Sequence, residues 1–260
     1  MIDSHAHYDD EQFDADRDDI IRKAVEAGVT HIINPGCDVE SSRQAILLAR
    51  KHPEVFAAVG VHPHQAASCD EKTLSGIEAL AREEKVVAIG EIGLDYHYDF
   101  SPREVQKEWF SKQVALAGKL GLPIIVHDRE SHQDVLDIVK AFRSELTTGV
   151  FHCFSGSVEM ARDVLDMGFY IGIGGSLTFK KARKPVEVVQ YAPLDRLLIE
   201  TDCPYLAPEP YRGRRNWSGY LKHVIERIAA IKGMAYDAVE WQTSDNARAL
   251  FGLDRFAVTA

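Results

Sequence analysis

The sharpest local pattern in this sequence is His5-Ala6-His7, which places two imidazole side chains two residues apart. Side chains of a β-strand alternate between its two faces, so both imidazoles are expected on the same face. Neutral imidazole together with carboxylate suits Zn²⁺, Mn²⁺ or iron, whereas carboxylate with water suits Mg²⁺. The alternative for an isolated pair is two satisfied polar side chains at a strand end, so a metal site requires further ligands.

Four later residues could supply such ligands, namely Glu91, His127, His152 and Asp202. Together with the two histidines they make six candidates, more than the four groups that surround one tetrahedral zinc ion. A carboxylate between two ligand sets can bridge ions about 3.5 to 4 Å apart, as in hydrolytic two-metal sites, and Glu91 is the natural bridge. We therefore expect two divalent ions, Mg²⁺, Mn²⁺ or Zn²⁺, as cofactors.

Asp202 is the candidate base, because a carboxylate can ligate one ion and also accept the proton of a metal-bound water. Asp202 and Glu91 are thus the predicted catalytic residues. The alternative for Asp202 is a helix N-cap, since Thr201-Asp202-Cys203-Pro204 also has the pattern of a turn before proline. The sequence has no G-x-S-x-G elbow and no G-x-x-x-x-G-K-[ST] loop, which argues against a serine hydrolase and a P-loop NTPase.

Short apolar or β-branched runs alternate along the chain with longer segments of helical periodicity, and this alternation predicts parallel strands joined by crossovers. Eight such units close most naturally into a (β/α)8 TIM barrel, although a doubly wound open sheet is also compatible. A barrel places its active site at the C-terminal ends of the strands, where the candidate ligands occur. The predicted strands are Met1–His7, Val29–Pro35, Val55–Pro63, Val86–Leu94, Pro123–Asp128, Gly149–Phe154, Phe169–Gly174 and Arg196–Asp202.

Length and composition agree with one barrel domain over residues 1–260, because 260 residues is the usual size of this fold and 45% of them are apolar. The net charge of −10 argues against a wide basic face that coats duplex DNA. The four cysteines form no C-x-x-C pair, the first residues are acidic rather than signal-like, and no apolar run approaches the ~18 residues of a membrane span. We expect a cytoplasmic protein without membrane association or an obligate protein partner.

Six blocks of sequence resemble the TatD-type metal-dependent deoxyribonucleases of the amidohydrolase superfamily. The resemblance implies metal ligation by the six candidates above and hydrolysis of phosphodiester bonds in DNA, commonly from the 3′ end. Tyr211, Trp217-Ser218 and Cys203 depart from the usual pattern of that family. The blocks are Asp3-Ser4-His5-Ala6-His7, Gly60-Val61-His62-Pro63, Gly90-Glu91-Ile92-Gly93-Leu94-Asp95-Tyr96, Val126-His127-Asp128-Arg129, Phe151-His152-Cys153-Phe154-Ser155-Gly156 and Glu200-Thr201-Asp202-Cys203-Pro204-Tyr205-Leu206.

Two basic clusters follow the seventh and eighth predicted strands, Lys180-Lys181-Ala182-Arg183-Lys184 and Arg212-Gly213-Arg214-Arg215. Such clusters can hold phosphates on the rim of the barrel, or they can be ordinary solvated charge. Aromatic rings on the same loops could stack on unpaired bases. The expected partner is therefore DNA as a substrate, either single-stranded or at the frayed ends of a duplex. The residues expected to contact it are His62, Asp95, Arg129, Phe154, Tyr205 and Arg212.

Two other functions remain compatible with the same residues. Barrel chemistry is set by loops, so the ligand set alone would also serve a small-molecule amidohydrolase or esterase with the same two-metal site. A module that binds metal without turnover is the third possibility. The basic rim and the match of six blocks favour a nuclease, and the complete set of ligands with a base argues against a module without turnover.

Overall fold

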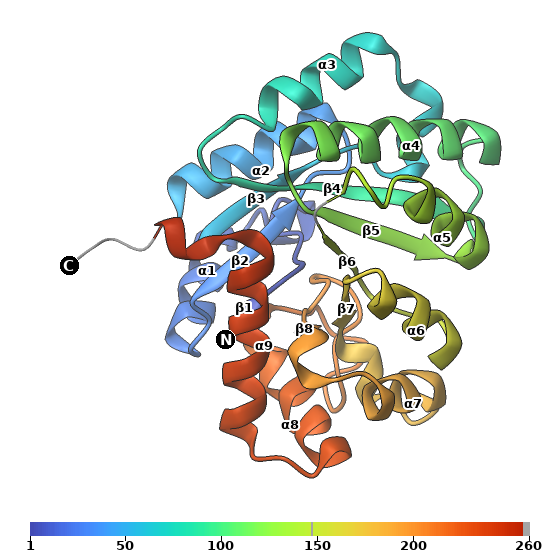
Figure 1. The fold of residues 1–260 in the computed structure, drawn as a ribbon. Coiled ribbons are helices and arrows are strands. Elements are labelled where there is room, and N and C mark those ends of the chain that lie inside the picture. The colour runs from blue at the N-terminus through green and yellow to red at the C-terminus, as the bar shows by residue number, and fades with distance from the viewer. Residues whose placement is uncertain (147, 257–260) are drawn as a thin grey trace.

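The computed structural model describes residues 1–146 and 148–256. Figure 1 shows its strands at the centre and its helices around them. The strands are β1 Ile2–Asp3, β2 His31–Pro35, β3 Val55–Val59, β4 Val86–Asp95, β5 Ile124–Arg129, β6 Gly149–Phe151, β7 Tyr170–Ile173 and β8 Leu197–Ile199. The helices are α1 Arg17–Glu26, α2 Val39–Lys51, α3 Glu71–Leu80, α4 Arg103–Leu120, α5 His132–Ala141, α6 Val158–Asp166, α7 Arg183–Tyr191, α8 Leu221–Lys232 and α9 Tyr236–Phe251.

The strands form one parallel sheet in which β1 to β8 follow one another in sequence order. Backbone hydrogen bonds bring the first and last strands together just beyond their ends. The Ser4 amide donates to the Ile199 carbonyl at 3.1 Å, and the Asp202 amide donates to the His5 carbonyl at 2.9 Å. A sequential order with its two edges in contact is a (β/α)8 barrel, which confirms the predicted fold and excludes the doubly wound open sheet.

All eight predicted strands are present, but several are shorter than predicted. The first strand ends at Asp3, so His5 and His7 lie beyond it rather than within it. The chain bends at Ser4 and His5, but it stays bonded to both neighbours, because the Ala6 amide donates to the Ile33 carbonyl at 3.0 Å while Ser4 bonds to β8. The two histidines are therefore positioned by a few single hydrogen bonds to both flanking strands instead of a continuous ladder.

The apolar core is divided by the alternation of side chains along the strands. Ile32, on β2, packs in the larger cluster, which includes residues of helices α1 to α8, whereas its neighbour Ile33 packs in a smaller cluster with Leu250 and Phe251 of α9. Full burial of one such side chain stabilises the fold by about 1.5–3 kcal/mol. A rigid apolar base thus supports the polar residues at the C-terminal ends of the strands. Within the described residues, no helix combines the length and apolarity that crossing a membrane requires.

Candidate metal centre

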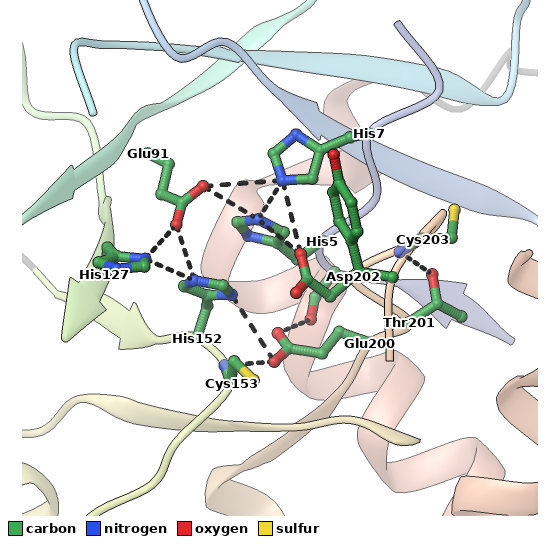
Figure 2. A network of polar contacts seen from close by, with 12 residues as sticks. His5, His7, Glu91, His127, His152, Cys153, Glu200, Thr201, Asp202 and Cys203 are labelled. Carbon is green, nitrogen blue, oxygen red and sulfur yellow. Dashed lines mark hydrogen bonds and ion pairs between the residues drawn. The ribbon is translucent and has the colours of Figure 1, made fainter. Parts of the chain in front are cut away.

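Six side chains that the sequence analysis selected as metal ligands converge at the C-terminal ends of the strands (Figure 2). Glu91, on β4, lies at their centre and is only 3% exposed. Its two carboxylate oxygens face different groups of side chains. One group follows β1 and β8, the first and last strands, and the other lies at the ends of the consecutive strands β5 and β6.

The Oε2 atom of Glu91 faces the residues that follow β1. It lies 3.4 Å from Nε2 of His5 and 3.7 Å from Nε2 of His7. The Oδ1 atom of Asp202, which follows β8, lies 3.5 Å from the same His7 nitrogen. Two imidazole nitrogens and two carboxylates thus surround one small volume.

The Oε1 atom of Glu91 faces the residues of β5 and β6. It lies 2.7 Å from Nδ1 of His127 and 2.8 Å from Nε2 of His152. His62, at the end of β3, approaches the same oxygen with its Nε2 at 3.7 Å. The His64 amide donates to Nδ1 of His62 at 3.2 Å, so the proton of a neutral His62 ring is on Nε2 and is directed into the site.

These residues fit a pair of divalent cations. The donor atoms are imidazole nitrogens and carboxylate oxygens, without a thiolate among them, which is the chemistry of Zn²⁺, Mn²⁺ or iron rather than of a cysteine-rich site. The Nε2 atoms of His5 and His7 lie 3.1 Å apart and point toward each other. A single carboxylate that offers one oxygen to each ligand set is the arrangement of a bridging ligand.

The electrostatics of the cluster also favour a cation. Burial, together with the neighbouring His152, lowers the pKa of His5 to about 4, so this ring is neutral at pH 7. Burial raises the pKa of Glu91, but His152 and His5 outweigh it and hold the pKa of that carboxyl well below its usual range. Burial lowers the pKa of His7, but its hydrogen bond to Asp202 and the charge of Glu91 raise it to about 9. Binding of a metal would replace a proton at that ring.

Asp95, a predicted substrate contact at the end of β4, is almost fully buried behind His127. Its Oδ2 atom lies 3.2 Å from Nε2 of His127 and 2.9 Å from Nε2 of His64. Its Oδ1 atom accepts hydrogen bonds from the amides of His97 and Tyr98. The structure therefore gives Asp95 contacts that orient His127 and the following loop, and its contact with substrate stays a prediction.

The other predicted substrate contacts differ in their exposure. Arg129, Tyr205 and Arg212 are exposed at the C-terminal ends of β5 and β8, although the Tyr205 hydroxyl donates to Asp10 at 2.6 Å. The Arg212 guanidinium stacks on Phe179, 4.4 Å from its ring centroid. Phe154 is buried in the larger apolar cluster, so its ring has little surface that a substrate could contact. Its part in substrate binding stays a prediction.

Glu200 is a buried carboxylate beside the site that the sequence analysis did not select. It accepts a hydrogen bond from the Cys153 amide, and its Oε1 lies 3.9 Å from Nδ1 of His152. Burial raises the pKa of Glu200 to about 7. The signal in the sequence was the position of Glu200 two residues before Asp202, within the predicted strand Arg196–Asp202. In the structure β8 ends at Ile199 and Asp202 has a φ of +56°, so strand alternation does not position the two side chains. Cys203, the residue after Asp202, packs in the larger apolar cluster.

The whole chain is similar to proteins of one family. The family model described as "TatD related DNase" matches residues 2–252. A relative from Bacillus subtilis (strain 168), named an uncharacterized metal-dependent hydrolase, YabD, is 45% identical over 254 residues, which cover 98% of this chain and 100% of the relative. A relative from Erwinia amylovora, named 3′-5′ ssDNA/RNA exonuclease TatD, is 38% identical over 259 residues, covering 97% and 100% of the two chains.

Solved structures agree with this similarity. The crystal structure of YJJV, a TatD homolog from Escherichia coli K12, superposes with a TM-score of 0.92 at 31% identity and covers 97% of this chain and 98% of that one. A TatD family hydrolase from Entamoeba histolytica superposes with a TM-score of 0.88 at 26% identity, covering 96% and 97% of the two chains. The match therefore extends over the barrel and over the loops that carry the candidate site.

Proposed function

The chain belongs to the family of TatD related DNases, and we propose that it is a metal-dependent 3′–5′ exonuclease that hydrolyses phosphodiester bonds of single-stranded DNA. Curated relatives at 36–38% identity are named 3′-5′ ssDNA/RNA exonucleases, which supports this activity and makes single-stranded RNA a second polymer to test. The proposal depends most on one observation, the Glu91 carboxylate with one oxygen directed at each of two ligand sets.

Divalent ions bound between these sets would supply Lewis acidity, which lowers the pKa of an attacking water and neutralises charge that develops on the scissile phosphate. Asp202 is the base that accepts the proton of the attacking water. Its hydrogen bond with His7 keeps the carboxylate ionised. Burial raises the pKa of this carboxyl, but that hydrogen bond and the neighbouring histidines lower it overall. A base of low pKa can hold a water proton only transiently, and Asp202 then returns it to solvent or to the leaving oxygen.

His62 is the proposed hydrogen-bond donor to the phosphate. Burial lowers the pKa of His62 well below its usual range, so the ring stays neutral. Its single proton lies on Nε2, the atom directed at the site. A neutral donor at this position orients a phosphoryl oxygen without adding charge of its own.

The rim of the barrel offers cations for the rest of a nucleic acid strand. Arg129 and Arg212 are exposed, and so are three lysines of the basic cluster that leads into the first turn of α7, namely Lys180, Lys181 and Lys184. Within residues 1–146 and 148–256, none of these five side chains is engaged in an ion pair. The hydrogen bond from the Glu209 amide to Thr178 holds the loops after β7 and β8 together, so the basic segments of both loops are neighbours. Unpaired cations at one rim are what phosphate binding requires on a protein of net charge −10.

The test is digestion of a 3′-labelled and a 5′-labelled single-stranded oligonucleotide by the protein loaded with Mg²⁺, Mn²⁺ or Zn²⁺. We expect loss of nucleotides from the 3′ end, no hydrolysis after EDTA treatment, and recovery when metal is returned. Asp202→Asn should retain metal, because an amide oxygen still coordinates, but should lose most of the activity, because an amide does not accept the proton. Hydrolysis of small esters without hydrolysis of DNA or RNA would reject the proposal in favour of a small-molecule hydrolase.

A cytoplasmic location belongs to the same proposal. The four cysteines are all free thiols in the structure. Free thiols are usual in a reducing compartment, which supports the cytoplasm as the place where this enzyme works.

A further inference from the structure

Two aromatic rings on the loop between β4 and α4 are exposed to solvent, although burial of such rings would stabilise the fold. Tyr98 is 49% exposed and Phe100 is 67% exposed. Their ring centroids are 5.3 Å apart with an angle of 20° between the planes, so the two rings stack on each other. The sequence analysis selected neither residue, since exposure cannot be read from a loop sequence.

The loop that carries these rings is fixed at both ends. At its start, Asp95 Oδ1 accepts hydrogen bonds from the His97 and Tyr98 amides at 3.0 and 2.9 Å. At its end, the buried Ser101 hydroxyl donates to the His64 carbonyl at 3.0 Å. The buried Gln106 side chain joins both ends, because its amide nitrogen donates to the carbonyls of Asp95 and Ser101. The two rings are therefore presented by an ordered loop rather than left free by a mobile one.

The rings lie next to the candidate metal centre. His64 contacts both of them edge-on, with centroid distances of 5.5 Å to Tyr98 and 4.8 Å to Phe100. The same His64 shares Asp95 with His127, the residue that faces Glu91. Arg129, at the end of β5, places its guanidinium carbon 4.7 Å from the Tyr98 ring centroid. The Tyr98 ring thus packs against both Arg129 and Phe100, and this group lies two side chains, His64 and Asp95, away from the predicted ligand His127.

We propose that Tyr98 and Phe100 form a stacking platform for an unpaired nucleobase of the strand whose 3′ end is in the metal centre, with Arg129 binding a neighbouring phosphate. The inference rests on the proposed nuclease function and assigns a site for the base, which the metal ligands cannot hold. Every base has a π-face, so the platform recognises single-stranded character rather than sequence. A paired base is stacked within its duplex and cannot lie on these rings.

The surroundings of the platform favour a base over a protein partner. Charged residues flank the two rings, including the His97–Glu130 and Arg103–Asp99 pairs. A stable protein interface needs roughly 800 Å² from each partner, with few charges at its centre. Two aromatic rings beside an arginine instead offer the two kinds of contact that a base and its phosphate make.

The test compares holoenzymes that carry Tyr98→Ala, Phe100→Ala or both with the ring-preserving variants Tyr98→Phe and Phe100→Tyr. Removal of one base stack should raise KM for a single-stranded oligonucleotide roughly 5- to 150-fold while kcat and metal content change little. The ring-preserving variants should retain the wild-type KM. Trp241→Ala is the matched control, because Trp241 is 62% exposed on α9 and should tolerate truncation without any change in KM.

Abasic substrates identify the interaction itself. An abasic nucleotide placed in turn at each of the last four positions should raise KM of the wild type at one position, and the same substitution should have no further effect on the double alanine variant. If circular dichroism shows that the double variant is poorly folded, the measurements on the wild type with abasic substrates still test the stacking platform.

The possible failures are distinguishable. A wild-type enzyme that hydrolyses neither DNA nor RNA overturns the proposed function. An active wild type that is indifferent to abasic substitution at all four positions, or whose KM does not change in a well-folded double alanine variant, overturns the platform alone. Loss of self-association in the alanine variants with an unchanged KM would likewise overturn it, in favour of a contact between copies of this chain.

Discussion

Asp95 bonds to the ring nitrogen of His127 that points away from Glu91. Nε2 of His127 lies 3.2 Å from Asp95 Oδ2, while Nδ1 of the same ring lies 2.7 Å from Glu91 Oε1. Asp95 thereby fixes which nitrogen of His127 carries the proton and leaves the other free to bind a metal.

Asp95→Asn should weaken metal binding, because an amide oxygen is a poorer acceptor for the His127 N–H than a carboxylate. Loss of such an orienting partner typically lowers metal affinity about 10- to 100-fold. Titration of the metal-free protein with Zn²⁺ or Mn²⁺ measures the effect. Asp134→Asn is the matched control, since the Asp134 carboxylate bonds to the Tyr96 hydroxyl and to Lys107, away from the predicted ligands. Equal affinities in wild type and Asp95→Asn would remove the orienting role.

Glu91→Gln should reduce the number of bound ions. Glutamine retains one carboxamide oxygen, so only one of the two ligand sets keeps an oxygen donor and the other faces an amide nitrogen. We expect metal analysis to give a lower content than in the wild type, with the barrel still folded by circular dichroism. Glu104→Gln, at a side chain that is 87% exposed, is the control. Wild-type metal content in Glu91→Gln would contradict a bridging carboxylate.

Arg212→Ala should weaken substrate binding, and it should also make the binding of substrate less sensitive to salt concentration. Each phosphate contact that is lost lowers the slope of log K against log salt by about 0.7 for a single strand. The measurement is KM at several NaCl concentrations. Lys23→Ala, in the last turn of α1 on the opposite end of the barrel, should leave the slope unchanged. A slope that stays constant in Arg212→Ala places this side chain outside the phosphate path.

Single-stranded or frayed ends should be hydrolysed faster than a blunt duplex. The predicted ligands are buried at the floor of a rim made of loops, and a duplex is too wide to bring its phosphates there. The comparison is the initial rate on one oligonucleotide, alone and annealed to its complement, at equal metal and salt. Equal rates would show that this account of access is wrong.

Gly172→Ala should destabilise the fold, because a β-carbon at this position would lie 2.5 Å from Glu200 Oε2. Overpacking of a filled core typically costs about 1–3 kcal/mol, or a few degrees in Tm for each kcal/mol in a chain of this size. Gly76→Ala is the matched control. Gly76 lies within α3, where the new methyl group would meet only Val39 at 3.6 Å, so its Tm should stay level or rise.

Much of the barrel and the convergence of the ligands could be predicted from sequence for a simple physical reason. Parallel strands have all their carboxyl ends at one rim, so a polar residue such as His127 or His152 after an apolar run must lie there. His5 and His7 also lie together at this rim, but strand alternation is not what places them there. Strand alternation was the expected cause, whereas both residues follow a strand that ends at Asp3.

Other features depend on contacts between loops, which a single sequence does not reveal. The burial of Phe154, the position of Asp95 behind His127, and the exposure of Tyr98 and Phe100 all follow from how the loops pack on one another. Hydrophobic periodicity describes residues within one helix or strand, and it does not show which loops pack against each other. This is why the substrate contacts were harder to predict than the candidate ligands.

The division of the candidate ligands between the middle and the two ends of the chain sets an order of events during synthesis. Glu91, His127 and His152 leave the ribosome before Asp202, and a single domain of this kind folds as a unit. His5 and His7, although made first, have no carboxylate partner from β8 until the last strand is complete. The part of the site at the junction of β1 and β8 can therefore form only when the barrel closes.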